Sequence, residues 1–292
     1  MILLLGSTGY VGTAFKQYFD TNQINFCTYQ LRFDFDENKF IEFLLKNKVT
    51  SIFNCAGYTG KPNVDTCELH KVETLQANAF LPKKLDIICG KHSIKLVQIS
   101  SGCIFNDPQC EQGLPPSQEY RDFDKPNFTF LDKKVSWYSG TKALGEALIN
   151  DYYGCNLICR LRIPFNGEIN SRNYINKLIN YQTLLNSTNS FSQLQEFVQA
   201  VYKLYTLNAG GIFNITQPGY ITTKEVVDLL QKYKLVTEKQ YFKSIEEFEA
   251  TCAAPRSNCV LDSSYLSTWN IKLTPIRQAM EDAIIKYAHN YG

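Results

Sequence analysis

The sequence opens with an apolar run that leads directly into a glycine-rich turn, Ile2-Leu-Leu-Leu-Gly-Ser-Thr-Gly-Tyr-Val-Gly12. The run is typical of a buried strand, and the residues after the turn have helical spacing. In such a strand–turn–helix unit, Gly6 permits the tight turn, Gly9 lets a pyrophosphate approach the backbone, and Gly12 allows close packing of helix on strand. The helix start also offers unpaired N–H groups to an anion. The stretch therefore predicts a dinucleotide site, the alternative being a glycine-rich turn that binds nothing.

Strands alternate with helices throughout the first half of the chain. We expect strands at 2–5, 25–29, 51–55, 96–100 and 157–162, and helices at 10–20, 39–47, 72–89 and about 138–152. Strands that alternate with helices of ~10–15 residues indicate βαβ units and a parallel sheet. The predicted fold class is therefore α/β, with a Rossmann-type doubly wound parallel sheet.

The pattern changes after Pro164. Helices are expected at 173–185, 223–233 and 275–289, with one further strand at 211–215. We therefore expect residues 1–163 to form the dinucleotide-binding domain, joined by a returning strand near 211–216. Residues 164–292 would then form mainly a smaller C-terminal α/β lobe that binds the substrate.

Composition excludes several classes of function. The 292 residues carry 30 basic and 28 acidic side chains, and the charges are not clustered, so neither nucleic acid nor a membrane surface is an expected partner. No segment approaches the ~20 apolar residues that span a bilayer. Without a secretory signal, the ten scattered cysteines indicate reduced thiols and a cytoplasmic protein. The three histidines form no cluster with the cysteines, so no metal site is expected.

The end of the second strand bears on the choice of cofactor. An NAD-selective site usually places an acidic residue there for the ribose 2′-OH, but the chain continues Tyr29-Gln-Leu-Arg32. An arginine can pair with a 2′-phosphate, so NADP is favoured. The alternative for Arg32 is a solvated surface side chain.

A phenol and an ammonium group lie four residues apart in Tyr138-Ser-Gly-Thr-Lys142, on one predicted helix. We expect Lys142 to lower the pKa of Tyr138, so that the phenol exchanges a proton with a carbonyl oxygen. Ser101 follows a strand, at the sheet edge where ligands bind in open α/β folds. An isolated pair of this kind is otherwise a surface feature.

The glycine spacing, together with Ser101, Tyr138 and Lys142, resembles the extended short-chain dehydrogenases/reductases and their Ser/Thr-Tyr-Lys triad. The resemblance implies hydride transfer with NADPH and places Asp34 near the adenine. The positions it assigns to cofactor contact are Gly6, Ser7, Thr8, Gly9, Tyr10, Val11, Gly12, Arg32, Asp34, Asn54, Ala56, Gly57, Tyr138 and Lys142.

Four longer segments make the resemblance more specific: Asn54 to Asp65, Ser101-Gly-Cys-Ile-Phe105, Arg172-Asn-Tyr-Ile-Asn-Lys177 and Ala254-Pro-Arg-Ser-Asn258. They are similar to the bifunctional UDP-4-keto-6-deoxy-D-glucose 3,5-epimerase/4-reductases, and more distantly to dTDP-4-dehydrorhamnose reductases. The resemblance implies conversion of UDP-4-keto-6-deoxy-D-glucose to UDP-L-rhamnose. A separate 4,6-dehydratase would supply that substrate, and a homodimer is compatible with the family.

In that family a cysteine and a second acid/base perform the epimerisation, and Cys103 and Lys177 occupy the matching positions. C3 and C5 flank the C4 ketone, so their protons become acidic once the enolate is stabilised. One group then removes a proton on one face and the other returns one. Ser101 stands where the family usually has threonine, which keeps the hydroxyl. The alternatives are a small buried thiol for Cys103 and a solvated charge for Lys177.

The weakest expectations concern substrate binding. The loop after the third strand supplies Thr59, Asn63 and Asp65 as candidates, and Arg256 could pair with the substrate diphosphate. Each could equally be an ordinary turn or surface residue. Two other functions stay open: a reductase without epimerase activity, and a non-catalytic NADP-binding regulatory subunit.

Overall fold

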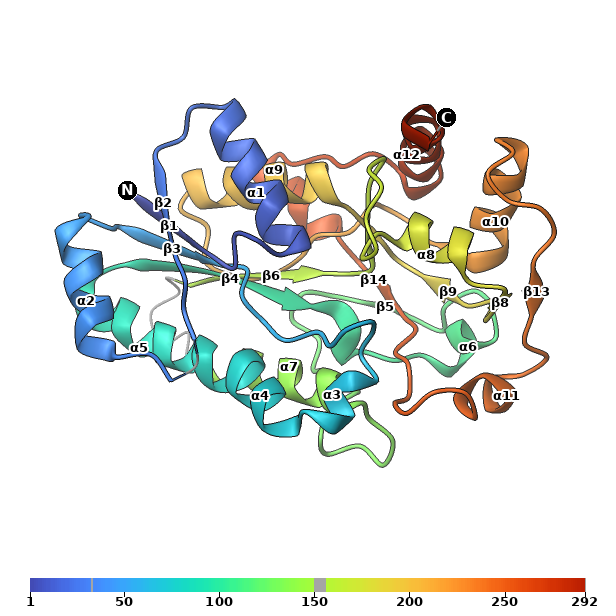
Figure 1. Cartoon of the computed structure of the whole chain (residues 1–292), viewed down its shortest axis with the longest axis horizontal. Coiled ribbons are helices and arrows are strands. Elements are labelled where there is room, and N and C mark those ends of the chain that lie inside the picture. Colours follow the sequence, from blue (N-terminus) through green and yellow to red (C-terminus); the bar gives the residue numbers. More distant parts are fainter. Residues whose placement is uncertain (33, 150–155, 292) are drawn as a thin grey trace.

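A six-stranded parallel sheet forms the centre of the molecule in the computed structural model, which describes residues 1–32, 34–149 and 156–291 (Figure 1). The strands lie in the order β11-β6-β4-β3-β1-β2. β2 lies on one side of β1 and β3 on the other, so the strand order reverses direction between β1 and β3. Such a switch point is where open α/β sheets bind ligands. The α/β prediction is confirmed. The strands are β1 (Ile2–Leu5), β2 (Phe26–Tyr29), β3 (Ser51–Asn54), β4 (Lys95–Ser101), β6 (Leu157–Leu161) and β11 (Gly211–Asn214).

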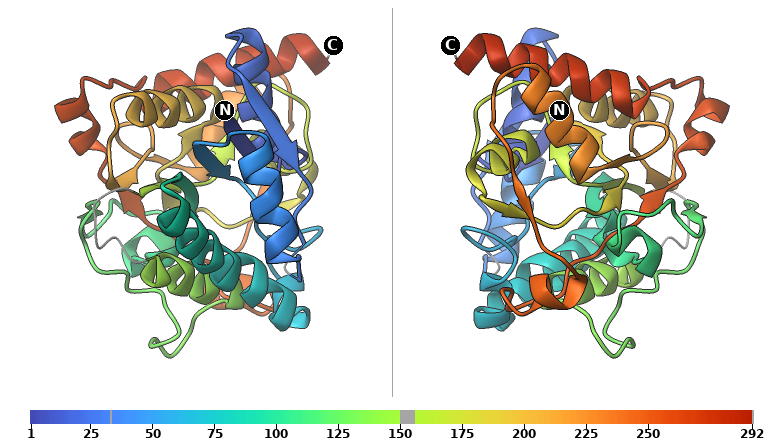
Figure 2. Two further views of the ribbon diagram at one scale, coloured as in Figure 1. Left: turned by 90° about the vertical axis from the view of Figure 1, so that its left-hand side faces the viewer. Right: turned by 90° about the vertical axis from the view of Figure 1, so that its right-hand side faces the viewer.

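Alternating side chains of β1 supply both faces of the sheet with core residues. Ile2 and Leu4 pack with α1 (Tyr10–Thr21) and α9 (Leu194–Thr206), whereas Leu3 and Leu5 face α2 (Glu37–Lys46) and α5 (Leu81–His92). A strand buried on both faces needs apolar residues at every position, which explains the unbroken run at 2–5. Figures 1 and 2 show the two helical layers on either side of the sheet.

Three helix predictions need correction. The expected helix at 72–89 is interrupted: α4 (Lys71–Leu75) leads through a π-helical turn (Gln76–Phe80) into α5. The expected helix at 173–185 ends early, as α8 (Tyr174–Asn180), because the chain turns extended at Tyr181. No element was expected at α9, although its buried residues recur every three or four positions. The helix expected from Tyr138 appears as α7 (Trp137–Leu148), and its expected end at Tyr152 lies outside the described residues.

The C-terminal part has a core of its own. There α8, α10 (Thr223–Lys232) and α12 (Ile276–Tyr291) pack around buried side chains such as Phe165 and Met280. β11 leaves this part to become the edge strand of the main sheet, parallel to β6. The remaining elements are α3 (Thr66–Leu69), α6 (Pro108–Glu111), α11 (Ile245–Glu249), 3-10 turns η2 (Gly102–Ile104) and η3 (Ser264–Trp269), and strands β5 (Glu119–Tyr120), β7 (Pro164–Phe165), β8 (Thr183–Leu184), β9 (Thr188–Asn189), β10 (Ser192–Gln193), β12 (Ile221–Thr222), β13 (Gln240–Tyr241) and β14 (Val260–Leu261).

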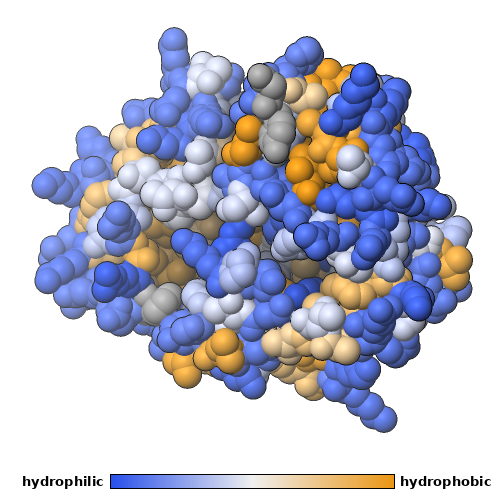
Figure 3. All heavy atoms as spheres, turned by 45° about the vertical axis from the view of Figure 1, so that its right-hand side comes forward, coloured by the Kyte–Doolittle hydropathy of each residue, from blue (hydrophilic) through white to orange (hydrophobic). Residues whose placement is uncertain are grey.

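The surface is mixed in character. The face drawn in Figure 3 is mostly hydrophilic, with hydrophobic side chains gathered in separate patches. Among the described residues, no helix is both long and apolar enough to cross a membrane.

Candidate active site

The glycine turn after β1 is shaped by backbone sterics. Gly6 has φ +69°, and a Cβ there would lie 2.6 Å from the amide nitrogen of Ala56. A Cβ on Gly12 would collide with the carbonyl oxygen of Gly6. Gly9 caps α1 without a side-chain hydrogen bond to the first turn, which leaves that turn's N–H groups to an external anion. The turn therefore fits the pyrophosphate of a dinucleotide.

The loop after β3 lies against this turn. Asn54 is fully buried, donates to Gln98 (2.7 Å) and accepts from the backbone N–H of Ala56 (3.1 Å), which fixes the loop's first residues. Gly57 is exposed beyond them. The side chain of Asn78, in the π-helical turn, donates to the carbonyl of Tyr58 (2.9 Å) and accepts from its N–H (2.8 Å). A π-turn is thus used to hold the loop.

The other predicted cofactor residues lie at the surface or along the first helix. Arg32 and Asp34 are exposed beyond β2, next to the carboxyl end of the sheet. Tyr10 is half-buried and donates its hydroxyl to Asn166 (2.9 Å) in the C-terminal part. Burial raises the pKa of Tyr10, and the nearby carboxylate of Glu168 adds to the effect. Tyr10 thereby connects the start of α1 to the residue that follows β7.

The Ser/Tyr/Lys residues converge at the carboxyl end of β4. Ser101 ends this strand, and its hydroxyl is near enough to the Tyr138 phenol from α7 to lower the pKa of that phenol. Lys142 lies one turn further along α7, is buried, and donates to the carbonyl of Ile99 (3.1 Å). Glu146, one more turn along, accepts a hydrogen bond from Ser100 (2.7 Å) and so fixes the helix against the strand.

The expectation that Lys142 lowers the pKa of Tyr138 is wrong for this structure. Burial raises the pKa of Tyr138, Cys103 adds to the effect, and the nearby Ser101 hydroxyl opposes it. Burial likewise lowers the pKa of Lys142 to about 8, against the opposing influence of Glu146 and Cys103. Burial thus shifts both groups toward their neutral forms, since a desolvated charge is costly, but a lysine with a pKa of about 8 is still mostly protonated at pH 7. The phenol keeps the proton that an acid must donate.

Cys103 is the common neighbour of the predicted catalytic groups. Its backbone N–H donates to the Ser101 hydroxyl (3.2 Å), and it affects the pKa values of Tyr138, Lys142 and Lys177. Lys177 comes from α8, in the C-terminal part of the chain. Burial lowers the pKa of Lys177, as do two nearby arginines. The structure therefore brings together all five residues predicted to be catalytic.

The predicted substrate residues divide into two sets. Asp65 and Arg256 form a two-pronged ion pair across 191 residues of sequence, with both oxygen–nitrogen distances at 2.8 Å. Arg256 was expected to be available for the diphosphate, but both of its terminal guanidinium nitrogens are hydrogen-bonded to the Asp65 carboxylate. Desolvation works against ionisation of Asp65, yet the hydrogen bonds and charge of Arg256 hold its pKa low. Asn63 accepts from the N–H of Asp65 (2.9 Å), whereas Thr59 is exposed.

Two residues of this region escaped the sequence interpretation. Asn78 fixes the β3 loop, and Arg162 donates from its guanidinium to the sulfur of Cys103 (3.1 Å). A signal for the second existed: Arg160 and Arg162 alternate with apolar residues at the end of a strand predicted to be buried. Charges in such a strand require partners or a function. In the described residues, no group of three or more His, Cys, Asp or Glu side chains is arranged to hold a metal ion.

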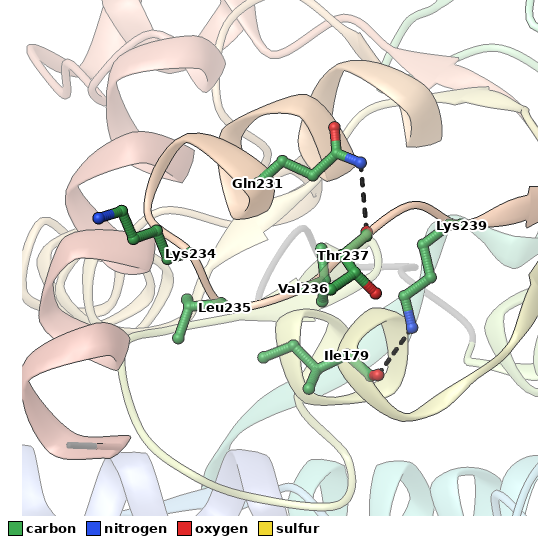
Figure 4. A pocket seen from close by; sticks show the side chains of 7 residues that line it. All are labelled: Ile179, Gln231, Lys234, Leu235, Val236, Thr237 and Lys239. Atoms are coloured by element: carbon green, nitrogen blue, oxygen red, sulfur yellow. Dashed lines mark hydrogen bonds between the residues drawn. The ribbon is translucent and has the colours of Figure 1, made fainter.

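Two hollows are lined by residues other than the predicted site residues. The larger, of about 550 Å³, is bordered by Ile179, Gln231, Lys234 and Lys239 (Figure 4). Its Lys239 donates to the carbonyls of Ile179 (2.8 Å) and Tyr181 (2.7 Å), so it closes the end of α8. The second, of about 430 Å³, lies beside Asp262 and Lys272. Neither is bordered by a residue predicted to be catalytic.

Comparison with protein-family models matches residues 1–289 to the RmlD substrate binding domain. The chain is 32% identical over 290 residues to an Arabidopsis thaliana trifunctional UDP-glucose 4,6-dehydratase/UDP-4-keto-6-deoxy-D-glucose 3,5-epimerase/UDP-4-keto-L-rhamnose-reductase; the match covers 98% of this chain but only 41% of that protein. It is also 32% identical over 284 residues to an Arabidopsis thaliana bifunctional dTDP-4-dehydrorhamnose 3,5-epimerase/dTDP-4-dehydrorhamnose reductase, covering 95% of this chain and 90% of that one.

Solved structures show the same fold. The crystal structure of the L780 UDP-rhamnose synthase from Acanthamoeba polyphaga mimivirus superposes with a TM-score of 0.88 at 24% identity, covering 98% of both chains. A dTDP-4-dehydrorhamnose reductase from Bacillus anthracis, solved in complex with NADP, gives a TM-score of 0.79 at 17% identity, covering 99% of this chain and 98% of that one.

Proposed function

Because the chain belongs to the RmlD substrate binding domain family, we propose that it is an NADPH-dependent reductase of 4-keto nucleotide sugars that also epimerises its substrate. The proposed reaction converts UDP-4-keto-6-deoxy-D-glucose to UDP-L-rhamnose. The observation that carries it is the position of Cys103, near enough to Tyr138, Lys142 and Lys177 to influence the pKa of each. A reductase alone has no use for Cys103 and Lys177.

Cofactor binding is assigned to the first part of the chain. The glycine turn and α1 start would hold the pyrophosphate, Asn54, Ala56 and Gly57 would border the nicotinamide side, and Arg32 would pair with a 2′-phosphate. The dTDP-4-dehydrorhamnose reductase from Bacillus anthracis was solved in complex with NADP, which supports this choice. When bound, NADPH supplies the hydride that reduces C4. We assign residues 1–163 to this domain and residues 164–292 mainly to substrate binding.

For the reduction, the chain must polarise the C4 carbonyl and protonate its oxygen. The hydroxyl of Ser101 is near enough to the Tyr138 phenol to influence its pKa, so both hydroxyls can address one substrate oxygen. Tyr138 then donates its phenolic proton to O4, and burial keeps that proton in place until it is needed. Lys142, one helical turn away, provides charge beside the phenol as the proton leaves.

For the epimerisation, protons at C3 and C5 must leave one face and return to the other. The same two hydroxyls stabilise the enolate oxygen that develops at C4. Cys103 and Lys177 come from different parts of the fold, η2 and α8, so they can approach the sugar from different sides. The lowered pKa of Lys177 makes its ammonium a readier proton donor.

One reaction tests the proposal: purified protein, UDP-4-keto-6-deoxy-D-glucose and NADPH in D₂O, followed by NMR and mass spectrometry. UDP-rhamnose carrying solvent deuterium at both C3 and C5 is expected. The Cys103→Ala variant should lose deuterium uptake, while Cys27→Ala, which alters a half-buried thiol on β2, should retain it.

Other results would each overturn a stated part. NADPH oxidation without deuterium uptake would leave a plain reductase, and rhamnose formation by Cys103→Ala would remove that residue from the mechanism. NADPH binding without turnover would favour a regulatory subunit. We further propose a cytoplasmic protein that depends on a 4,6-dehydratase for its substrate, with a homodimer as the assembly to test by light scattering.

A further inference from the structure

Arg162, the residue that follows β6, is buried directly beneath the candidate epimerase cysteine. Only 1% of its surface is exposed, and its Nη1 donates to the sulfur of Cys103 at 3.1 Å. The hydroxyl and carbonyl of Ser257 accept from the same guanidinium at 3.1 and 2.7 Å, and the Asn189 side chain accepts at 2.5 Å. The guanidinium is therefore held in one orientation, with one N–H aimed at sulfur.

The charge of Arg162 is not balanced by a carboxylate. Arg160, two residues earlier and equally buried, forms an ion pair with Glu146 at 2.6 Å. Within the described part of the chain, Arg162 has no Asp or Glu at ion-pair distance, and its buried Nε has no hydrogen-bond partner. A buried charge without an opposite charge is strongly disfavoured, and a guanidinium stays protonated. An acceptor that carries negative charge would relieve this cost.

Three thiols surround Arg162, and two of them are unsuited to that role. Burial raises the pKa of Cys259 to about 11, with Arg162 opposing, and burial raises that of Cys110 to about 12. Both are therefore neutral near pH 7. Cys103 is half-buried and accepts directly from the guanidinium, so it is the one placed to carry the charge.

We propose that Arg162 is the positioning residue that holds Cys103 as a thiolate beside the other predicted catalytic groups. This inference rests on the proposed epimerase function. In the step it serves, the thiolate sulfur takes the proton from the carbon beside the ketone: the C–H bond breaks, an S–H bond forms, and the electron pair moves to the C4 oxygen as the enolate. Lys177 returns a proton to carbon on the other face, and both groups are reset by exchange with water.

The test measures the thiolate directly, in cofactor-free protein at pH 7. Iodoacetamide reacts with thiolates, so alkylation is followed peptide by peptide by mass spectrometry. Cys103 should react at least about tenfold faster than Cys27, the half-buried thiol on β2, whose pKa is raised by burial. The wild-type protein should also show 240-nm thiolate absorbance that Cys103→Ser removes. Equal rates together with no absorbance difference would overturn the proposal.

Variants separate charge from mere packing. Arg162→Met keeps much of the side-chain volume but loses the cation, and it should slow Cys103 alkylation about tenfold or more, as expected for loss of a charge-assisted hydrogen bond. Arg162→Lys should recover part of the rate, and Cys27 should react equally in all three proteins. An unchanged Cys103 rate in folded Arg162→Met contradicts the proposal. If Arg162→Met does not fold, the wild-type rate and absorbance still decide.

The same variants distinguish this inference from the proposed function. Arg162→Met should lose deuterium uptake at C3 and C5 by a larger factor than it loses NADPH oxidation with an already epimerised 4-keto sugar. Equal losses would indicate a merely structural arginine and contradict the inference. A reactive Cys103 in a wild-type protein that takes up no deuterium would refute the epimerase function while supporting the arginine–thiolate pair.

Discussion

The glycine turn and the cluster around Cys103 lie at the same end of the sheet but are built in opposite ways. The turn occupies seven consecutive residues, and its shape depends on backbone atoms: the carbonyl of Gly6 leaves no space for a Cβ on Gly12. The cluster draws side chains from β4, α7, α8 and the end of β6, which are far apart in sequence. In the turn a substitution changes shape, whereas in the cluster it removes a reacting atom.

The largest effect is expected where one atom performs the chemistry. Tyr138→Phe removes only the phenolic hydroxyl, so we expect NADPH-dependent reduction to fall by roughly 10²–10⁴-fold. Thermal stability should change little, because the half-buried ring keeps its packing. The measurement is kcat for reduction together with Tm. A large loss of Tm with modest loss of kcat would mean that the cluster, like the turn, is limited by shape.

In the turn, stability and cofactor affinity should fall together. Gly12→Ala places a methyl group against the Gly6 carbonyl, and overpacking of this kind costs ~1–3 kcal/mol. We expect weaker NADPH binding in titrations and a lower Tm. Gly90→Ala is the matched control, since a Cβ there meets no atom within 4 Å and alanine favours its helix. Unaltered NADPH affinity in Gly12→Ala would contradict the assignment of the site.

This difference also decides what the sequence could predict. The turn, the alternating burial of β1 and the order of elements follow from local pattern, since each depends on neighbours a few residues away. The convergence of Cys103 and Lys177 was reached only through family resemblance, because no local rule brings η2 next to α8. The pair between Asp65 and Arg256 was missed for the same reason, whereas α9 had a clear helical period and was simply overlooked.

Lys142 is subject to both kinds of constraint. Its ammonium group is part of the cluster around Cys103, whereas its burial results from the packing of the fold. Its pKa is about 8 in the folded chain and ordinary in the unfolded chain. Above pH 7 the folded protein therefore loses this proton at a lower pH than the unfolded protein does. The contribution of Lys142 to the free energy of unfolding consequently rises with pH. Between pH 7 and 9.5 the wild type should gain on the order of 1–2 kcal/mol relative to Lys142→Met, measured by urea denaturation of both proteins. A constant difference would show that Lys142 is not desolvated in solution.

Replacement of Arg32 should have the smallest effect on activity and stability, because Arg32 lies in neither the glycine turn nor the cluster around Cys103. It is exposed beyond β2, so its replacement should leave both Tm and the kcat with NADPH unchanged. If it pairs with the 2′-phosphate, Arg32→Gln should weaken NADPH binding about tenfold and leave NADH binding as it was, since one exposed charge-assisted contact is lost. Lys16→Gln, which removes an exposed charge from α1, is the control for long-range electrostatics. Equal changes for the two cofactors would mean that Arg32 acts only through net charge, and the selectivity would then have to come from another side chain near the end of β2.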